Sequence, residues 1–532
     1  MASAWGLAAE GSASELEAFE KLKPRLVEIW RTVEGGADVK HTSVVVPSFS
    51  LDQKELAKID GISFYEERLL FFLIRLRNPR ARLVYITSQP VHPLILEYYF
   101  QLLAGIPASH ARSRLTLLCV HDSSPRPLTE KILERPRLMQ RIRQAIEDAP
   151  PAYLTVFNST PLERRLAVEL GIPLMGVDPS LTGYGTKSGS RKAFRAAGVP
   201  HPAGFEDLRT ERNLAEALEM LRRRRPGLQR AVVKLNDSFS GEGNALFRYP
   251  EDGRRAGLET LLPDLEFTNR NESYANFLAQ VGEMGAVVEE FLEGHGKRSP
   301  SAQLQIDPEG TCQLVSTHDQ ILGGAEGQIF MGCRFPAEEA YRSEVQDQGM
   351  KVAEVLAKAG IIGRFGIDFV ARPSGEAPSG WELQAIEINL RKGGTTHPFL
   401  ALQFLTGGGL DPGTGLFHAP TGHVKYYLST DSLQSRRLHG LLPEDLIEIT
   451  TSSGLHYSPG PETGVLFHMI GALSQFGKLG VTAIGNTRDE AEQIYQHTLS
   501  VLDREADPRT RAGTRTGSGL RAAPLWGPGP PD

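Results

Sequence analysis

The chain has 532 residues, of which 40% are hydrophobic and 23% charged, and its net charge is −6. Such a length predicts about three domains, and the negative net charge argues against nucleic-acid binding through a broadly basic surface. Three dispersed cysteines exclude a disulfide framework or zinc motif, and there is no secretory pattern or membrane-length apolar run, so we expect a cytoplasmic protein without membrane or nucleic-acid partners.

The chain begins with a predicted amphipathic helix over residues 14–33. Its apolar stripe consists of Leu16, Phe19, Leu22, Leu26 and Ile29. Pro24 lies inside this helix and predicts a kink or a break. A second helical pattern, near 66–77, is dense in Leu and Phe and is therefore predicted to be core.

Four apolar strands alternate with helical patterns in this first part of the chain, at 43–46, 83–87, 115–120 and 153–157. Strands that alternate with helices predict a parallel α/β sheet. Each strand ends in a short polar loop, and open α/β sheets bind ligands beyond the carboxyl ends of their strands. The candidate substrate contacts in these loops are Ser48, Gln89, His92, Asp122, Ser123 and Arg126. The same residue types also form turns and helix caps, and both roles remain open for each residue.

Two segments carry lysine near glycine in a way that suggests phosphate binding. Residues 183–188 read GYGTKS, which fails as a P-loop because Thr186 stands where glycine should precede the lysine. Residues 231–244 read AVVKLNDSFSGEGN, with Lys234 at the end of a strand and a glycine-rich loop after it. Backbone N–H groups of such a loop can surround phosphate oxygens, although a glycine loop alone usually forms only a turn.

The densest chemistry lies in residues 363–398, GRFGIDFVARPSGEAPSGWELQAIEINLRKGGTTHP. We predict two strands here, one near 365–371 and one near 381–390. Side chains two apart on a strand share a face, so Glu387, Asn389 and Arg391 would align, and pairing of the strands could bring Asp368 beside them. Two carboxylates and an amide oxygen suit Mg²⁺, and the arginine suits phosphate or carboxylate. An ordinary solvent-facing edge strand is the alternative, which fits the alternating isoleucines poorly.

The pattern GIDF…EINLR resembles the metal-binding signature of the ATP-grasp superfamily of carboxylate–amine ligases. The resemblance covers about residues 181–410, and the motif order is most similar to that of pheganomycin-type peptide ligases. It implies that Asp368, Glu387 and Asn389 hold Mg²⁺ on ATP, with two ions expected. It also implies a preceding pre-ATP-grasp domain.

Other positions gain roles from the same resemblance. For the nucleotide, it implies phosphate cations at Lys187, Arg191 and Lys234, a loop over the triphosphate at Ser238, Ser240, Gly241 and Gly243, and adenine and ribose contacts at Glu289, Glu290, Leu292 and Glu293. Gln303 stands where relatives often have an acid, which weakens the ribose assignment. For catalysis, it implies that the cations Arg334, Arg391 and Lys234 neutralise the phosphates. The backbone N–H groups and side chains of the following turn could hold the acceptor carboxylate or the acyl phosphate, with candidates Gly394, Thr395, Thr396 and His397. A surface basic helix remains the alternative for Arg191, and a simple capped turn for 393–398.

We therefore expect an α/β protein with a parallel-sheet pre-ATP-grasp domain at 1–180, an ATP-grasp α+β domain at 181–410, a small α/β substrate-cleft module at 411–503 and a disordered tail at 504–532. The resemblance implies an ATP-dependent ligase that forms an amide from small-molecule or peptide carboxylates and amines through an acyl phosphate. A non-catalytic ATP-binding regulator and phosphoryl transfer to a non-carboxylate acceptor are the alternatives. A homodimer is left open.

Overall fold

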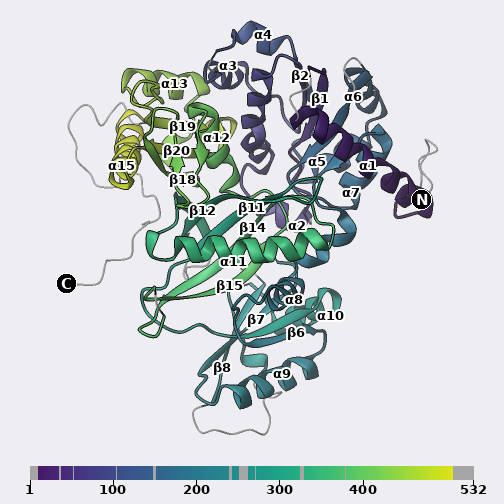
Figure 1. The fold of residues 1–532 in the computed structure, drawn as a ribbon, viewed down its shortest axis with the longest axis vertical. Coiled ribbons are helices and arrows are strands. Elements are labelled where there is room, and N and C mark those ends of the chain that lie inside the picture. Colours follow the sequence, from purple (N-terminus) through teal and green to yellow (C-terminus); the bar gives the residue numbers. More distant parts are fainter. Residues whose placement is uncertain are drawn as a thin grey trace.

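The computed structural model describes residues 10–34, 38–51, 53–103, 105–147, 151–238, 243–250, 262–269, 271–323, 329–377 and 379–506. These residues form three sheets with helices packed on them, and Figure 1 shows α11 (Glu339–Lys358) running across the middle of the molecule, above the lower lobe. Residues 507–532, most of the expected tail, lie outside the described residues, as do Ser240 and Gly241. In the part described, no helix is both long and apolar enough to cross a membrane.

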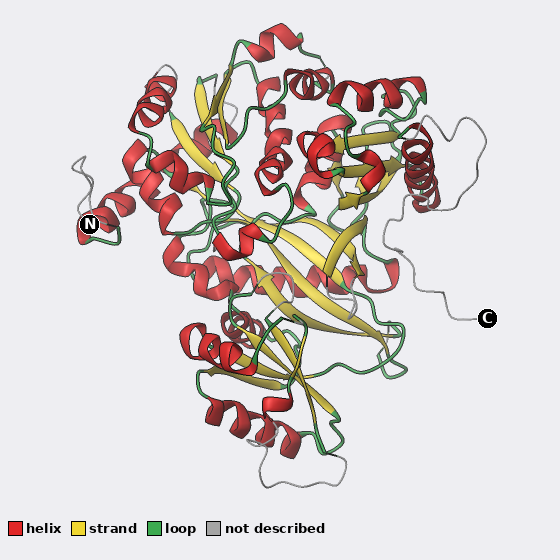
Figure 2. Cartoon of the chain, turned by 180° about the vertical axis from the view of Figure 1, so that it is seen from behind, coloured by secondary structure: helices red, strands yellow, loops and turns green. Residues whose placement is uncertain are grey.

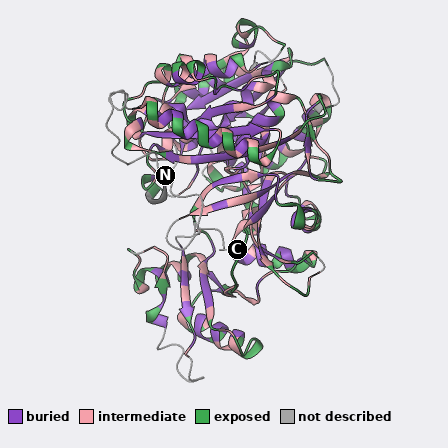
Figure 3. Ribbon diagram, turned by 90° about the vertical axis from the view of Figure 1, so that its left-hand side faces the viewer, coloured by how far each residue is buried: buried purple, intermediate pink, exposed green. Residues whose placement is uncertain are grey.

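The first sheet is parallel and has the order β3-β2-β1-β4-β5, as the alternating pattern predicted. Its strands are β1 (His41–Val46), β2 (Ala81–Thr87), β3 (Leu115–Cys119), β4 (Ala152–Val156) and β5 (Leu174–Met175). The helices of this part are α1 (Ala13–Glu34), α2 (Gln53–Ala57), η1 (Ile62–Arg77), α3 (Pro93–Gln101), α4 (Ala108–Arg112), α5 (Leu128–Leu133), α6 (Pro136–Glu147) and α7 (Pro161–Leu170). Across the molecule, Figure 3 shows strands that are mostly buried and helices whose outer faces are exposed.

Two helices of this part differ from the simplest expectation. Helix α1 runs through Pro24 as one element, because Phe19, Leu22, Leu26 and Ile29 bury its inner stripe on both sides of the proline. The core helix near 66–77 is a long 3₁₀ helix, η1, rather than an α-helix. In a 3₁₀ helix, residues three apart lie on the same face, which matters for the site below.

The second sheet forms a smaller lobe, seen at the lower end of Figure 1, with the order β6-β10-β7-β8-β9. Its strands are β6 (Gly204–Leu208), β7 (Arg230–Leu235), β8 (Asn244–Arg248), β9 (Glu266–Phe267) and β10 (Ala286–Glu290). The nearby helices are η2 (Pro179–Gly185), α8 (Lys187–Ala197), α9 (Glu211–Arg224) and α10 (Tyr274–Met284). A separate apolar core lies between this sheet and α9 and α10.

The third sheet has ten strands and is antiparallel, and its long strands cross the middle of the molecule in Figure 2. Its main path contains β15 (Trp381–Asn389), β14 (Gly363–Pro373), β11 (Pro300–Ile306), β12 (Cys312–Gly323), β13 (Ile329–Phe335), β18 (Val424–Gln434), β17 (Phe417–His418) and β16 (Gly409–Leu410), while β20 (Lys478–Gly485) pairs with β18 and β19 (Gly464–His468). The helices beside it are α11, α12 (Thr396–Thr406), α13 (Pro443–Ser452), α14 (Leu473–Phe476) and α15 (Arg488–Glu505), with short turns η4 (Arg436–Leu438) and η5 (Ile470–Ala472). Because β13 pairs with β18, residues on both sides of 411 share this sheet.

Candidate active site

The two acids of the GIDF…EINLR motif face each other on neighbouring strands. In the antiparallel pairing of β14 with β15, Asp368 is opposite Glu387 and Gly366 is opposite Asn389. The Asn389 Nδ2 donates to Asp368 Oδ2 at 2.9 Å, and an Arg391 Nη2 donates to Asn389 Oδ1 at 3.2 Å. Gln320 on β12 donates to the other Asp368 oxygen at 2.7 Å. The predicted convergence of the four motif side chains is therefore confirmed.

Two lysines approach this patch from the smaller lobe and its leading helix. Lys187 is the first residue of α8, is only 7% exposed, and its Nζ lies 2.6 Å from Glu387 Oε1. Lys234 on β7 lies 2.7 Å from Glu289 Oε2 on β10. At the end of the glycine loop, a side chain on Gly243 would place its Cβ 2.4 Å from Ser238 Cβ, so glycine is required there.

These side chains line one cavity of about 300 Å³ between the three parts of the chain. Its predicted members are Lys187, Lys234, Ser238, Asp368, Glu387, Asn389, Arg391, Gly394 and Thr395, and Gln303 also lines it. Gly394 allows a close approach, since a Cβ there would lie 2.7 Å from a ring carbon of Phe330. One cavity thus joins cations, facing carboxylates and a glycine turn.

The electrostatics of the two facing acids bear on whether they could hold a metal ion. Burial, followed by the charge of Glu387, raises the pKa of Asp368 to about 7. A divalent cation would relieve that repulsion, and Asn389 would add a neutral oxygen. Among the described residues, no group of three or more His, Cys, Asp and Glu side chains forms a complete cage. Two carboxylates with an amide suit Mg²⁺, which shares its shell with water and phosphate rather than filling it with protein.

Arg191 does not lie on the cavity, contrary to the expectation that it shares the phosphate role of Lys187. It is 2% exposed, and its guanidinium donates to Glu289 Oε1 at 2.6 Å, to Glu206 at 3.2 Å and to the Pro202 carbonyl at 2.8 Å. Although burial opposes it, Lys234 and Arg191 hold the pKa of Glu289 below its usual value. Glu289 therefore anchors two cations, and of these only Lys234 reaches the cavity.

The last residue of β10 and the residues just after it, for which adenine and ribose contacts are implied, bond to other parts of the protein. The Glu290 N–H donates to the Ala203 carbonyl at 2.8 Å, and the Leu292 carbonyl accepts from Lys297 Nζ at 2.8 Å. Both Glu293 carboxylate oxygens accept from Arg230. These three positions do not line the cavity, so their implied contacts need a rearrangement that the structure does not contain.

Three further predicted site residues do not line this cavity. Arg334 points to α15, where its guanidinium lies 3.4 Å from Glu492, and it is absent from the cavity lining. Thr396 is buried, and its Oγ1 accepts from the Gly393 N–H at 3.0 Å, as a turn residue would. His397 is 2% exposed and packs behind the cavity, with its ring centre 4.1 Å from that of His468.

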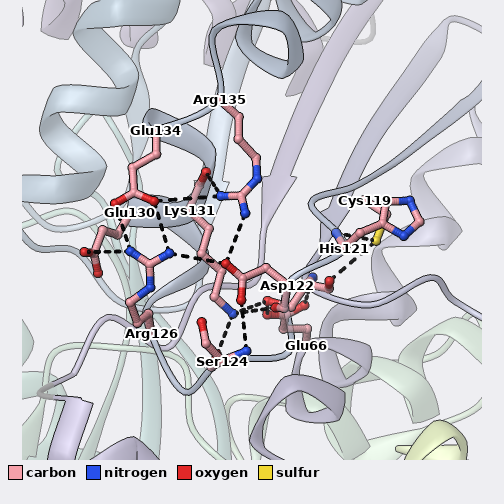
Figure 4. A network of polar contacts seen from close by, with 11 residues as sticks. Glu66, Cys119, His121, Asp122, Ser124, Arg126, Glu130, Lys131, Glu134 and Arg135 are labelled. Atoms are coloured by element: carbon pink, nitrogen blue, oxygen red, sulfur yellow. Dashed lines mark hydrogen bonds and ion pairs between the residues drawn. The ribbon is translucent and has the colours of Figure 1, made fainter.

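The polar loops of the first sheet form a closed network that we call the Asp122 cluster (Figure 4). Its members are Glu66, Ser88, Asp122, Ser124, Arg126, Lys131 and Arg135. Hydrogen bonds from Ser124 and Arg135, with the charge of Lys131, hold the pKa of Asp122 below its usual range despite some burial. Asp122 is thus held by contacts within the protein and does not line the cavity.

The other predicted loop residues are also off the cavity. Ser48 is fully buried and bonds Ser50 Oγ at 2.9 Å and the Thr129 N–H at 3.2 Å. Neither Gln89 nor Ser123 lines the cavity. The cap and turn roles that sequence reasoning left open are what Ser48 and Asp122 perform.

Sequence reasoning missed the aromatic and cationic wall that the first part contributes. This wall consists of Phe49, Tyr65, Arg68 and Phe157. Phe49 lies in the polar loop from which only Ser48 was predicted to contact substrate, and Phe157 is the last residue of the predicted strand 153–157. Arg68 and Tyr65 are three apart on η1, a spacing that places both side chains on one face of the 3₁₀ helix. The polar Gln320 on β12 was likewise missed.

Comparison with known proteins is consistent with this geometry. Residues 180–249 and 264–412 match the "IQCH-like, ATP-grasp" family, and residues 445–498 match the "PGM1 C-terminal domain". The chain is 32% identical over 479 residues to L-propargylglycine--L-glutamate ligase of Streptantibioticus cattleyicolor, covering 87% of this chain and 95% of that protein. It is 24% identical over 547 residues to IQ motif-containing protein H of Danio rerio, covering 92% of this chain but 51% of that longer protein.

Solved structures support the fold. Biotin carboxylase of Campylobacter jejuni, a β-γ-ATP complex, is 13% identical with a TM-score of 0.52, covering 89% of this chain and 97% of that one. The biotin carboxylase domain of Hydrogenobacter thermophilus 2-oxoglutarate carboxylase, solved with MgADP, ADP and bicarbonate, is 13% identical with a TM-score of 0.51, covering 90% and 96%. Together with the 32% identity to a ligase over most of both chains, the site and the fold lead to one conclusion: this protein belongs to the ATP-grasp superfamily of carboxylate–amine ligases.

Proposed function

We propose that this protein uses ATP to join the carboxylate of one amino acid or short peptide to the amine of another. The observation that carries the proposal is the facing pair Asp368 and Glu387, set in one cavity with Lys187, Lys234 and Arg391. ATP serves as a substrate here. Mg²⁺, when held by Asp368, Glu387 and Asn389, supplies charge that offsets the phosphates.

The reaction we propose has two displacements. A carboxylate oxygen of the first substrate attacks the γ-phosphorus, the bond from that phosphorus to the bridging oxygen breaks, and ADP leaves. The amine nitrogen of the second substrate then attacks the acyl carbon, the carbon–oxygen bond to phosphate breaks, and the nitrogen loses a proton as the amide forms. Phosphoryl transfer depends mostly on positioning and charge neutralisation.

Each cavity residue has a place in that scheme. Lys187 now neutralises Glu387 at 2.6 Å, and it can turn to a phosphate oxygen when a metal takes over that carboxylate. Lys234 is fixed by Glu289 at the lobe side. Arg391 and the turn at Gly394 and Thr395 lie beside the carboxylate pair, where the acyl phosphate would form.

The proposal divides the chain by role. We propose that residues 181–410 bind the nucleotide, while residues 1–180 and 411–503 complete the substrate side of the cavity. Phe49 and Arg68 line the cavity from the first part. Asp431 reaches it indirectly, through its ion pair with Arg68 at 2.6 Å.

The decisive experiment pairs two variants of one strand. Glu387→Gln should lower ADP release on amino acid pairs by roughly 100-fold or more, because charge stabilisation in the site is lost. Glu382→Gln is the matched control, since Glu382 also lies on β15 but pairs with Arg372 outside the cavity. ADP release and amide product would be measured for pairwise mixtures of L-amino acids, beginning with L-glutamate and apolar partners. Equal activity in the two variants would refute the metal assignment.

Two results would favour the alternatives. ATP binding without turnover on any pair would favour a nucleotide-binding regulator, and a phosphorylated product without an amide would favour phosphoryl transfer to another acceptor. Intact circular dichroism spectra for both variants would show that any loss of activity is chemical.

A further inference from the structure

Arg68 occupies an aromatic cage in the cavity wall. Its guanidinium carbon lies 4.8 Å from the ring centre of Phe49, 4.7 Å from Tyr65 and 5.1 Å from Phe157. Phe49 and Phe157 stack on each other at 4.2 Å. An arginine between aromatic faces is held in a fixed orientation by cation–π attraction. The side chain is 7% exposed, yet it lines the cavity.

The hydrogen bonding of Arg68 is incomplete. Its Nη1 donates to Asp431 Oδ2 at 2.6 Å, while the buried Nε has no hydrogen-bond partner among the described residues. The other Asp431 oxygen is 2.6 Å from His468 Nε2, so Asp431 is already shared. A buried donor without an acceptor is costly, and a carboxylate is the acceptor that matches the arginine fork.

Arg68 and Arg391 enter the same cavity from different elements. Arg391 follows β15 and lies among the motif residues, whereas Arg68 comes from η1 in the first part of the chain. Amide formation consumes one carboxylate, which must reach the γ-phosphate near Arg391. An α-amino acid that supplies the amine keeps its own carboxylate throughout, and that group needs a second, separate cation.

We propose that Arg68 binds the unreacted α-carboxylate of the amine-donating substrate, and that this substrate is an α-amino acid whose side chain packs on Phe49 and Phe157. The inference rests on the proposed ligase function, since it assigns one of the two substrates of that reaction. It places the amine donor on the wall made by the first part of the chain.

The test compares an amino acid with its α-carboxamide, which keeps the amine but loses the charge. With the amine donor that the ADP-release screen identifies, wild-type kcat/KM should fall about 30-fold from acid to amide, as expected for a lost charged hydrogen bond. In Arg68→Lys and in the charge-balanced double variant Arg68→Met with Asp431→Asn, that preference should shrink to near unity. The KM for ATP should stay close to that of wild type.

Arg75→Lys is the matched control, because Arg75 is on the same 3₁₀ helix and bonds Ser43 and Tyr153 but does not line the cavity. It should retain the wild-type preference. An unchanged preference in the Arg68 variants, or equal use of acid and amide by the wild type, would overturn the proposal.

Failure of the ligase function can be told apart from failure of this assignment. Thermal unfolding of the MgADP-loaded protein would be followed with L-leucine and L-glutamate and with their α-carboxamides. A stabilisation by the acids alone that disappears in Arg68→Lys supports a carboxylate site at Arg68 even without turnover. No difference between acids and amides, whatever the turnover, rejects it.

Discussion

Two acidic clusters in this molecule differ in how the charges of their carboxylates are balanced. In the Asp122 cluster, hydrogen bonds from Ser124 and Arg135 and the charge of Lys131 lower the pKa of Asp122, while burial raises the pKa of Glu66 to about 7 even though Ser88 donates to it. At Asp368, a second carboxylate stands directly opposite, and burial with that charge raises the pKa to about 7. The Asp122 cluster is held by the protein's own contacts and does not line the cavity, so we infer that it is scaffold. The facing pair Asp368 and Glu387 lines the cavity and is suited to a cation that offsets its charge.

The largest expected effect tests the scaffold cluster. Lys131→Met should lower the free energy of unfolding by about 3–5 kcal/mol, because it removes one partner of a buried charge network. Lys131 is 1% exposed, and its Nζ donates to Ser88 Oγ and to the carbonyls of Asp122 and Ser124. Urea unfolding would measure the change.

The matched control is Arg126→Met in the same cluster. Because Arg126 is partly exposed, its replacement should lower the free energy of unfolding by less than that of Lys131. The Lys131→Met protein that remains folded should keep its kcat/KM. A stability loss no larger than that of the control, or a specific loss of turnover, would contradict the scaffold role.

The second prediction is a rise, rather than a fall, in the free energy of unfolding. Asp368→Asn should raise the free energy of unfolding at pH 8 by roughly 1–3 kcal/mol, because it removes a buried like-charge contact, while ligase activity is lost. Asp411→Asn is the control, because Asp411 accepts from Thr414 and Gly413 on an exposed loop and its pKa is lowered by those bonds. Destabilisation by Asp368→Asn would mean that the pair is not strained.

The smallest effect concerns Arg334, which was expected to be catalytic. Arg334→Gln should change the free energy of unfolding by no more than ~1 kcal/mol, as is typical of partly exposed ion pairs, and should leave ADP release close to wild type. Parallel assays of Arg391→Gln, which alters a cavity residue, give the comparison. A loss of ADP release in Arg334→Gln as large as that in Arg391→Gln would show that Arg334 acts in catalysis.

The sequence predicted local patterns better than distant encounters. The alternation of strands and helices indicated the parallel sheet, and period-two spacing placed Glu387 and Asn389 on one face of β15. The sequence did not predict that Asp122 contacts Lys131 and Arg135, because these contacts depend on how the following helices pack over the strand ends. Arg68 was missed for a similar reason. It lies on the 3₁₀ helix η1, whose dense Leu and Phe pattern predicted only a core helix.

The pairing of β13 with β18 has a mechanical consequence. Moving the chain beyond residue 411 relative to β14 and β15 would break backbone bonds between β13 and β18, such as those around Cys333 and Ser429. The five-stranded lobe lies outside that continuous sheet. A rotation of the lobe β6-β10-β7-β8-β9 would break none of the backbone bonds of that sheet, and it would change the distance between Lys234 on β7 and Asp368 on β14.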